Sequence, residues 1–248
     1  MWEQPTRHAL AAFEHADHED QAFDALNTFA RAVGADLLSY HHIDPPLSRA
    51  DEAGGMPTIN LMSHGFPDEW VRHYESSDYH RIDPITAFAA YQTRPVLWSN
   101  IPHRVRLSPA QQAYMEDLYR WLSPGDGLAV PLFGPSGRHG YVGIGWRKPI
   151  PPWDPVKRRA IQSVCESFHL RICELRLAGM ERDFELTDVQ MRILRAMASG
   201  QPDAIICGMV NLRPEALRTA IARTLTTMGV SDRPSAVLRA HALGLIDA

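Results

Sequence analysis

Three segments decide the fold class of this chain: FPDEWVRHYE at residues 66–75, RIDPI at 81–85 and RPVLW at 94–98. Trp70 and Tyr74 are four residues apart, a spacing that places both rings on one face of a helix. Asp83 precedes Pro84, and a residue before proline favours an extended backbone over a continued helix. A carboxylate at such a bend can point toward the indole and the phenol, which predicts a small polar cluster in an apolar wall. The alternative is that both rings belong to the core and that Asp83 caps or turns the chain.

The order and approximate spacing of six residues resemble the hallmark set of the autoinducer-binding domain of LuxR-type quorum-sensing regulators: Trp70, Tyr74, Asp83, Pro84, Trp98 and Gly127. This resemblance implies an acyl-homoserine lactone as the ligand. It implies that Trp70 donates to the lactone carbonyl and that Asp83 accepts from the amide N–H. Trp98 and Gly127 would shape the lactone end of the pocket, with Tyr74 lining it beside them.

The chain departs from the family pattern at two further pocket positions. Phe66 stands where some relatives carry a tyrosine that bonds the acyl carbonyl, and Gly143 aligns near an expected serine or threonine. We therefore expect Phe66 and Gly143 to line a pocket that has lost a hydrogen bond and gained volume. An aryl, branched or long acyl chain would use that space. The sequence specifies neither the identity of the acyl chain nor whether the signal is a lactone.

The composition describes a globular chain of 248 residues, 45% hydrophobic and 22% charged, long enough for one large or two modest domains. Its formal net charge of −4 argues against a protein devoted wholly to nucleic acid. Three cysteines in no disulfide-like pattern predict reduced thiols in a cytoplasmic protein. The first residues do not resemble a signal peptide, and no apolar run approaches the ~20 residues of a membrane span. No Cys/His spacing suggests zinc, so we expect no metal and no cofactor.

Periodicity along the chain predicts an α+β protein, with an N-terminal α-β-α sensor domain around a central antiparallel sheet and a C-terminal all-α domain. The expected strands are at residues 35–43, 58–63, 128–133 and 141–147, with helices between and around them. The expected domains are an autoinducer-binding domain at 1–178, a linker at 179–184 and a helix-turn-helix DNA-binding domain at 185–248.

The C-terminal segment shows four short helical patterns, the second and third joined by a tight turn, which is typical of a helix-turn-helix. Its whole length resembles the LuxR-type DNA-binding domain, which implies double-stranded DNA as a partner. Its third helix departs from the family pattern, and from residue 184 onward seven arginines face six acidic residues. That balance is weak for phosphate binding. The candidate DNA contacts are Arg213, Arg218, Thr219 and Arg223, and the alternative is a solvated helix face.

A long amphipathic helix before the linker carries an apolar stripe made of Ile161, Val164, Phe168, Ile172 and Leu175. Because relatives dimerise in this region, the stripe predicts a homodimer. The alternative is that the stripe packs on its own domain.

Two other functions compete with a DNA-binding regulator. A LuxR-like anti-activator would silence a related activator through heterodimerisation, with little DNA binding. A lactone-acting enzyme is the second, because residues 134–137 read GPSG. The second glycine comes one residue too early for a nucleophile elbow, however, and the segment sits at a predicted hairpin tip. We therefore expect no enzyme.

Overall fold

The computed structural model describes residues 2–45, 59–89, 92–122, 125–149, 154–181 and 186–246. The chain divides into two compact units. The first comprises Met1–His42, Ile59–Gly134 and His139–Ile172, and the second comprises Ile43–Thr58, Pro135–Arg138 and Cys173–Ala248.

The first unit is built on a five-stranded sheet with the order β2-β1-β5-β4-β3. Its strands are β1 (Leu37–Ile43), β2 (Ile59–His64), β3 (Val96–Leu97), β4 (Asp126–Phe133) and β5 (His139–Trp146). The β4–β5 hairpin is antiparallel from the pair Asp126–Trp146 to the pair Phe133–His139, and β3 pairs antiparallel with β4. Four of these strands fall where the sequence predicts them. The two-residue strand β3 is too short for a period-two pattern to reveal.

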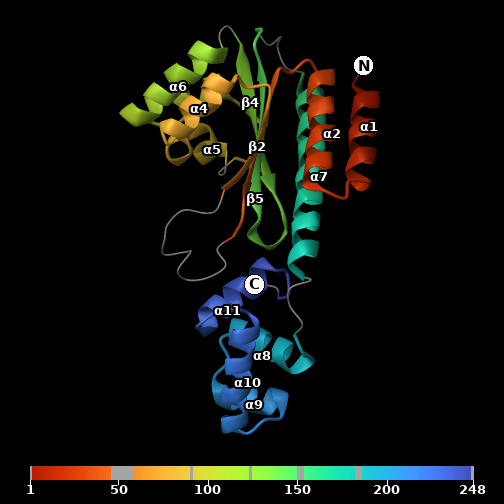
Figure 1. The fold of residues 1–248 in the computed structure, drawn as a ribbon, viewed down its shortest axis with the longest axis vertical. Helices are drawn as coiled ribbons and strands as arrows, with labels where there is room; N and C mark the ends of the chain where they lie inside the picture. Colours follow the sequence, from red (N-terminus) through yellow and green to blue (C-terminus); the bar gives the residue numbers. More distant parts are fainter. Residues whose placement is uncertain are drawn as a thin grey trace. The chain divides into compact units, whose positions relative to one another are not determined.

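Helices cover both faces of this sheet, as the predicted α-β-α arrangement requires. Figure 1 shows helices on both sides of the sheet. One face carries α1 (Glu3–Glu14), α2 (Glu19–Ala32) and α7 (Pro155–Glu181); the other carries α4 (Asp68–Ser76), α5 (Pro84–Ala89) and α6 (Pro109–Leu122). Two 3-10 helices lie between these elements in the chain: η1 (Tyr79–Arg81) connects α4 to α5, and η2 (Trp98–His103) follows β3.

The α7 face is a closed apolar core. Phe168 of α7 is fully buried, with its ring centroid 4.7 Å from Tyr40 and 5.8 Å from Phe13. The stripe predicted to dimerise lies in this core, because four of its five members are 0% exposed: Ile161, Val164, Phe168 and Ile172. These side chains are already covered within their own domain, so the predicted dimerisation surface was wrong.

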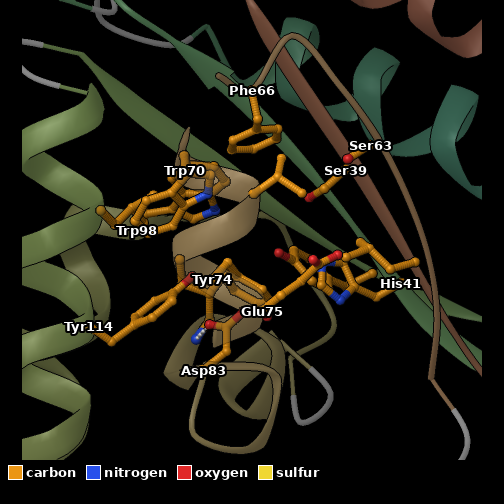
Figure 2. Close-up of a pocket in the computed structure, with 15 residues that line it drawn as sticks. Ser39, His41, Ser63, Phe66, Trp70, Tyr74, Glu75, Asp83, Trp98 and Tyr114 are labelled. Carbon is orange, nitrogen blue, oxygen red and sulfur yellow. Dashed lines mark hydrogen bonds between the residues drawn. The ribbon is translucent and has the colours of Figure 1, made fainter. Parts of the chain in front are cut away.

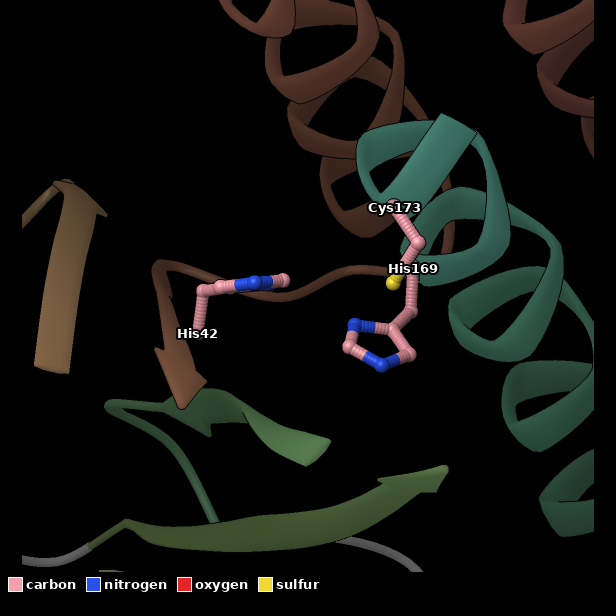
Figure 3. A group of neighbouring side chains, drawn as sticks. All are labelled: His42, His169 and Cys173. Atoms are coloured by element: carbon pink, nitrogen blue, oxygen red, sulfur yellow. The ribbon is translucent and has the colours of Figure 1, made fainter. Parts of the chain in front are cut away.

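A polar triad interrupts this core. The hydroxyl of Tyr40 lies 2.7 Å from Nδ1 of His42 and 2.8 Å from Nδ1 of His169, and all three side chains are buried. Figure 3 shows the two imidazoles, one from β1 and one from α7. Cys173 follows His169 by one helical turn. The hydrogen bonds compensate the cost of burying polar groups here.

The second unit contains the four predicted C-terminal helices: α8 (Asp188–Ala198), α9 (Asp203–Val210), α10 (Pro214–Thr227) and α11 (Arg233–Ala242). At the start of α8, the Thr187 side chain accepts from the Gln190 N–H while the Gln190 side chain accepts from the Thr187 N–H. This capping box satisfies two otherwise unpaired backbone N–H groups. The predicted linker begins inside α7, which continues to Glu181, and residues 182–185 lie outside the described chain. Among the described residues, no helix combines the length and apolarity needed to cross a membrane.

Candidate ligand-binding site

A pocket lies on the opposite face of the sheet from α7. Alternation along β1 sends Leu38 and Tyr40 into the closed core and turns Ser39 and His41 toward the pocket. The helices α4, α5 and α6 supply the facing wall (Figure 2). The lining is mainly aromatic and aliphatic, with a few polar groups: Ser39, His41, Leu61, Ser63, Phe66, Trp70, Val71, Tyr74, Glu75, Asp83, Ile85, Trp98, Tyr114, Leu118 and Tyr141.

Helix α4 positions Trp70 and Tyr74 as the sequence predicts. Pro67 holds the extended position before the helix, and Asp68 and Glu69 occupy its first turn, where acidic residues favour the helix dipole. Trp70 is 4% exposed, and its ring lies 6.1 Å from that of Tyr74 and 6.2 Å from that of Tyr114.

Asp83 serves both as a helix cap and as a pocket group, so the two interpretations of this residue are compatible. Its Oδ1 accepts from the backbone N–H of Ile85 at 2.8 Å, the pattern of an N-cap for α5. Its Oδ2 accepts from the Thr86 hydroxyl at 2.9 Å and from the Tyr74 hydroxyl at 3.3 Å. The cap fixes the carboxylate, and the long Tyr74 contact is the one a ligand N–H would most easily share. Pro84 begins α5 and is buried behind the lining.

The surroundings of Asp83 penalise its charge. Burial raises the pKa of its carboxyl above the ordinary 3.8, although the hydrogen bonds from Ile85, Thr86 and Tyr74 oppose this shift. Burial, followed by the Asp83 charge, raises the pKa of the Tyr114 hydroxyl well above 10. The Tyr74 and Tyr114 hydroxyls therefore stay protonated and can donate hydrogen bonds. A further donor from a ligand would stabilise the charged form of the Asp83 carboxyl.

Gly127 explains the position of Trp98. A Cβ at Gly127 would come within 2.2 to 2.5 Å of the Trp98 ring, so only glycine lets the indole lie against β4. Trp98 is 2% exposed, and its Nε1 has no hydrogen-bond partner among the described residues. Gly127 itself does not line the pocket; it shapes the pocket through Trp98.

Gly143 does not open space in the pocket, which corrects the sequence-based expectation. A Cβ there would lie 2.6 Å from Oγ of Ser39 and 3.2 Å from the Tyr141 hydroxyl. Side chains from β1 and β5 thus fill the volume that a serine on β5 would take, and Ser39 brings a hydroxyl to the same place. Phe66 lines the pocket as predicted.

Six polar or aromatic lining residues were not predicted from the sequence: Ser39, His41, Ser63, Glu75, Tyr114 and Tyr141. Because successive side chains of a strand point to opposite faces, Ser39 and His41 of β1 share one face. Which face would carry the pocket was not visible, because that depends on which helices cover it.

The four candidate DNA contacts are all solvent-exposed. Arg213 is the residue before α10, and Arg218, Thr219 and Arg223 lie on α10. The Thr219 hydroxyl donates to the Glu215 carbonyl, and Leu217 and Ile221 bury the opposite side of the helix. Their exposure leaves these side chains accessible to a partner.

Comparison with known proteins gives the class. Residues 18–172 match the autoinducer-binding domain family. The chain is 25% identical over 192 residues to RpaR, an HTH-type quorum sensing-dependent transcriptional regulator of Rhodopseudomonas palustris, covering 77% of each chain. Its fold is similar to crystalline Escherichia coli SdiA, with a TM-score of 0.78, 15% identity and 98% of each chain covered. It is also similar to SdiA in complex with octanoyl-rac-glycerol, with a TM-score of 0.70, 16% identity and coverage of 97% and 94%.

The matched domain spans more than half of the chain, and the chain belongs to the autoinducer-binding domain family. It is a LuxR-type regulator of transcription that responds to a small-molecule signal. Since the family binds a signal and its relatives are named as regulators, the chain is not an enzyme.

Proposed function

We propose that this protein binds an acyl-homoserine lactone in the pocket between the sheet and α4–α6, and that it regulates transcription by binding DNA through α10. The observation that carries the ligand is the pairing of a buried carboxyl, Asp83, with the indoles of Trp70 and Trp98 in one pocket, where the Trp98 N–H has no hydrogen-bond partner among the described residues. An amide N–H and a carbonyl, side by side, complement this arrangement. The remaining lining suits an acyl chain. The proposal requires no cofactor and places the protein in the cytoplasm.

A glyceride is the competing ligand, because a structural relative is described with octanoyl-rac-glycerol. N-octanoyl-homoserine lactone and octanoyl-glycerol both carry an eight-carbon acyl chain, but only the lactone has an amide N–H that Asp83 can accept. Binding of N-octanoyl-homoserine lactone and of octanoyl-glycerol, followed by tryptophan fluorescence, separates them. We expect the lactone to bind more tightly to the wild type and to lose about ten- to hundredfold in affinity on Trp70→Phe. Lack of lactone binding by the folded wild type would overturn the proposal.

The DNA half of the proposal rests on the three exposed arginines Arg213, Arg218 and Arg223. Because the seven arginines from residue 184 onward barely exceed the six acidic residues, a single unit would bind DNA loosely. Occupancy would then need two units at half-site spacing, set by a homodimer whose arrangement the ligand favours. The surface that joins two copies is not the α7 stripe, which is buried.

Fluorescence anisotropy on labelled promoter DNA, with and without N-octanoyl-homoserine lactone and across salt concentrations, tests this half. Arg218→Ala should weaken binding and reduce the salt slope by about 1 if the residue contacts phosphate. Equal DNA affinity of residues 181–248 alone and of the liganded full chain would contradict coupling. If no fragment binds, heterodimerisation with a related activator becomes the better function.

A further inference from the structure

His41 is a buried imidazole on the wall of the pocket. It lies in β1 and is 6% exposed, and its ring centroid is 4.4 Å from that of Tyr141, at an interplanar angle of 33°. Figure 2 shows His41 on the strand side of the pocket, away from Trp98 and Tyr114. No hydrogen bond joins its imidazole to any residue in the described part of the chain.

His41 shares its lack of a partner with the Trp98 indole nitrogen, which belongs to the same pocket, whereas its polar neighbours on β1, β5 and α7 have partners. His42 and His169 both hydrogen-bond the Tyr40 hydroxyl on the opposite face of the sheet. On the pocket side, the Tyr141 hydroxyl hydrogen-bonds Ser39 and Thr86. The usual partners of buried polar groups are thus present at each of these positions, and His41 departs from the pattern where it meets the cavity.

Stacking on Tyr141 explains the position of the His41 ring but leaves both of its nitrogens without partners. His41 lines the cavity, and its nitrogens are not among the fully buried polar atoms of the described residues that lack a partner, so a group in the cavity can reach them. Burial lowers the pKa of His41 to about 3, so the imidazole is neutral at physiological pH. A neutral imidazole offers one N–H donor and one acceptor nitrogen, and it therefore suits a hydroxyl or a carbonyl.

We propose that His41 hydrogen-bonds a hydroxyl or carbonyl substituent on the acyl chain of the ligand, and so selects for signals with a polar chain. This inference rests on the proposed function, because Asp83 and Trp70 must hold the head of an acyl ligand while the chain reaches β1. Tyr141 links His41 to the Asp83 cluster, because its ring stacks on His41 and its hydroxyl bonds Thr86, a partner of Asp83. We therefore assign His41 to the part of the ligand next to the head group that Asp83 holds.

The test measures dissociation constants of four ligands of equal chain length by tryptophan fluorescence: N-octanoyl-homoserine lactone and its 3-oxo, 3-hydroxy and 8-hydroxy forms. In the wild-type full-length protein, at least one substituted ligand should bind about tenfold more tightly than the plain chain. His41→Phe keeps the stacked ring but removes both nitrogens, and it should abolish this preference, measured as the ratio of the two dissociation constants. His41→Gln restores a donor and an acceptor and should recover part of the preference.

Two results would overturn the inference. One is a wild type that binds the plain ligand but prefers no substituted form, a measurement that needs no variant and stands even if His41→Phe fails to fold. The other is an unchanged preference in folded His41→Phe. Both differ from failure of the proposed function, in which the folded wild type binds none of the four lactones.

Discussion

The two faces of the central sheet are built from the same strands but do different things. On the α7 face, Phe168 is 0% exposed and packs between aromatic rings, and the polar groups present there bond one another. On the face toward α4–α6, Trp98 keeps an indole N–H without a partner and His41 has no hydrogen bond to any described residue. The closed face stabilises the fold, while the open face retains unpaired polar groups that a ligand can satisfy. The unpaired polar groups that ligand binding needs are thus confined to one face of the sheet, and the other face supplies the stability.

The largest effect on stability is expected on the closed face. Phe168→Ala should lower the free energy of unfolding of the sensor domain by about 3–5 kcal/mol, because it removes a large buried ring and leaves a cavity. Urea denaturation followed by circular dichroism measures the change. Leu170→Ala on the same helix is the matched control, since Leu170 is 45% exposed and should change stability by less than about 1 kcal/mol. Equal losses from both variants would show that α7 is covered by a second copy or another domain.

Gly127→Ala is expected to disturb the open face next. Its methyl group would overlap the Trp98 ring, and such overpacking typically costs about 1–3 kcal/mol. Ligand affinity should fall along with stability, because the displaced indole shapes the pocket. Thermal unfolding and ligand titration measure the two effects. Gly179→Ala is the control: a Cβ there meets nothing within 4 Å, so the substitution in α7 should not destabilise the chain. Unchanged binding in Gly127→Ala would show that the Trp98 position is unimportant.

Asp83→Asn should weaken binding of an acyl-homoserine lactone by about 1–3 kcal/mol, about ten- to hundredfold. The ionised carboxyl accepts the ligand N–H, and its pKa in the free protein is raised by burial. Wild-type affinity should therefore rise as pH increases through this raised pKa and then level off, whereas Asp83→Asn should show no such rise. Isothermal titration calorimetry across pH measures both. An equal pH dependence in the two proteins would place its origin elsewhere.

The raised pKa of Asp83 affects the stability of the unliganded protein in the opposite direction from ligand affinity. A carboxyl whose pKa is raised on folding stabilises the protein at low pH, and this contribution is lost as pH rises through the raised pKa. Asp117 provides the contrast, because hydrogen bonds from Tyr79 and His73 lower its pKa. Asp117 stabilises the fold at pH values above the ordinary carboxyl pKa, and this contribution to stability is lost as pH falls through its lowered pKa.

Tyr74→Phe should have the smallest effect. Its hydroxyl reaches Asp83 at 3.3 Å, which is long for an O–H donor, and Thr86 and Ile85 continue to hold the carboxyl. We expect a change of about 1 kcal/mol or less in ligand binding, measured in the same titrations as Asp83→Asn. A loss as large as that of Asp83→Asn would show that the phenol itself contacts the ligand.

Much of the fold was predictable because local physics determines it. Prolines lie at or just before the first residue of α4, α6, α7 and α10, and the turn at residues 134–137 between two apolar runs marks the β4–β5 hairpin. The cluster of Trp70, Tyr74 and Asp83 follows from helix spacing and from the bend at Pro84. These predictions succeeded because each signal lies within a few residues of the structure that it specifies.

The failures concern contacts between distant segments. The α7 stripe shows the same helical period whether it packs on its own sheet or on a second copy, and the structure places it in its own core. Gly143 suggests an empty space, but Ser39, more than a hundred residues earlier, fills that space. No local pattern contains this information.

The sequence by itself determined the helices and strands, the two-part organisation and the group of residues around Asp83, because propensity, capping and periodicity act over short distances. Only the tertiary structure decided which face of the sheet stays open, that Gly127 serves Trp98, and that His41 reaches the pocket without a hydrogen bond to any described residue. These outcomes depend on which helices cover each face and on which side chains meet across strands. They are consequences of packing in three dimensions, where residues far apart in the chain compete for the same volume.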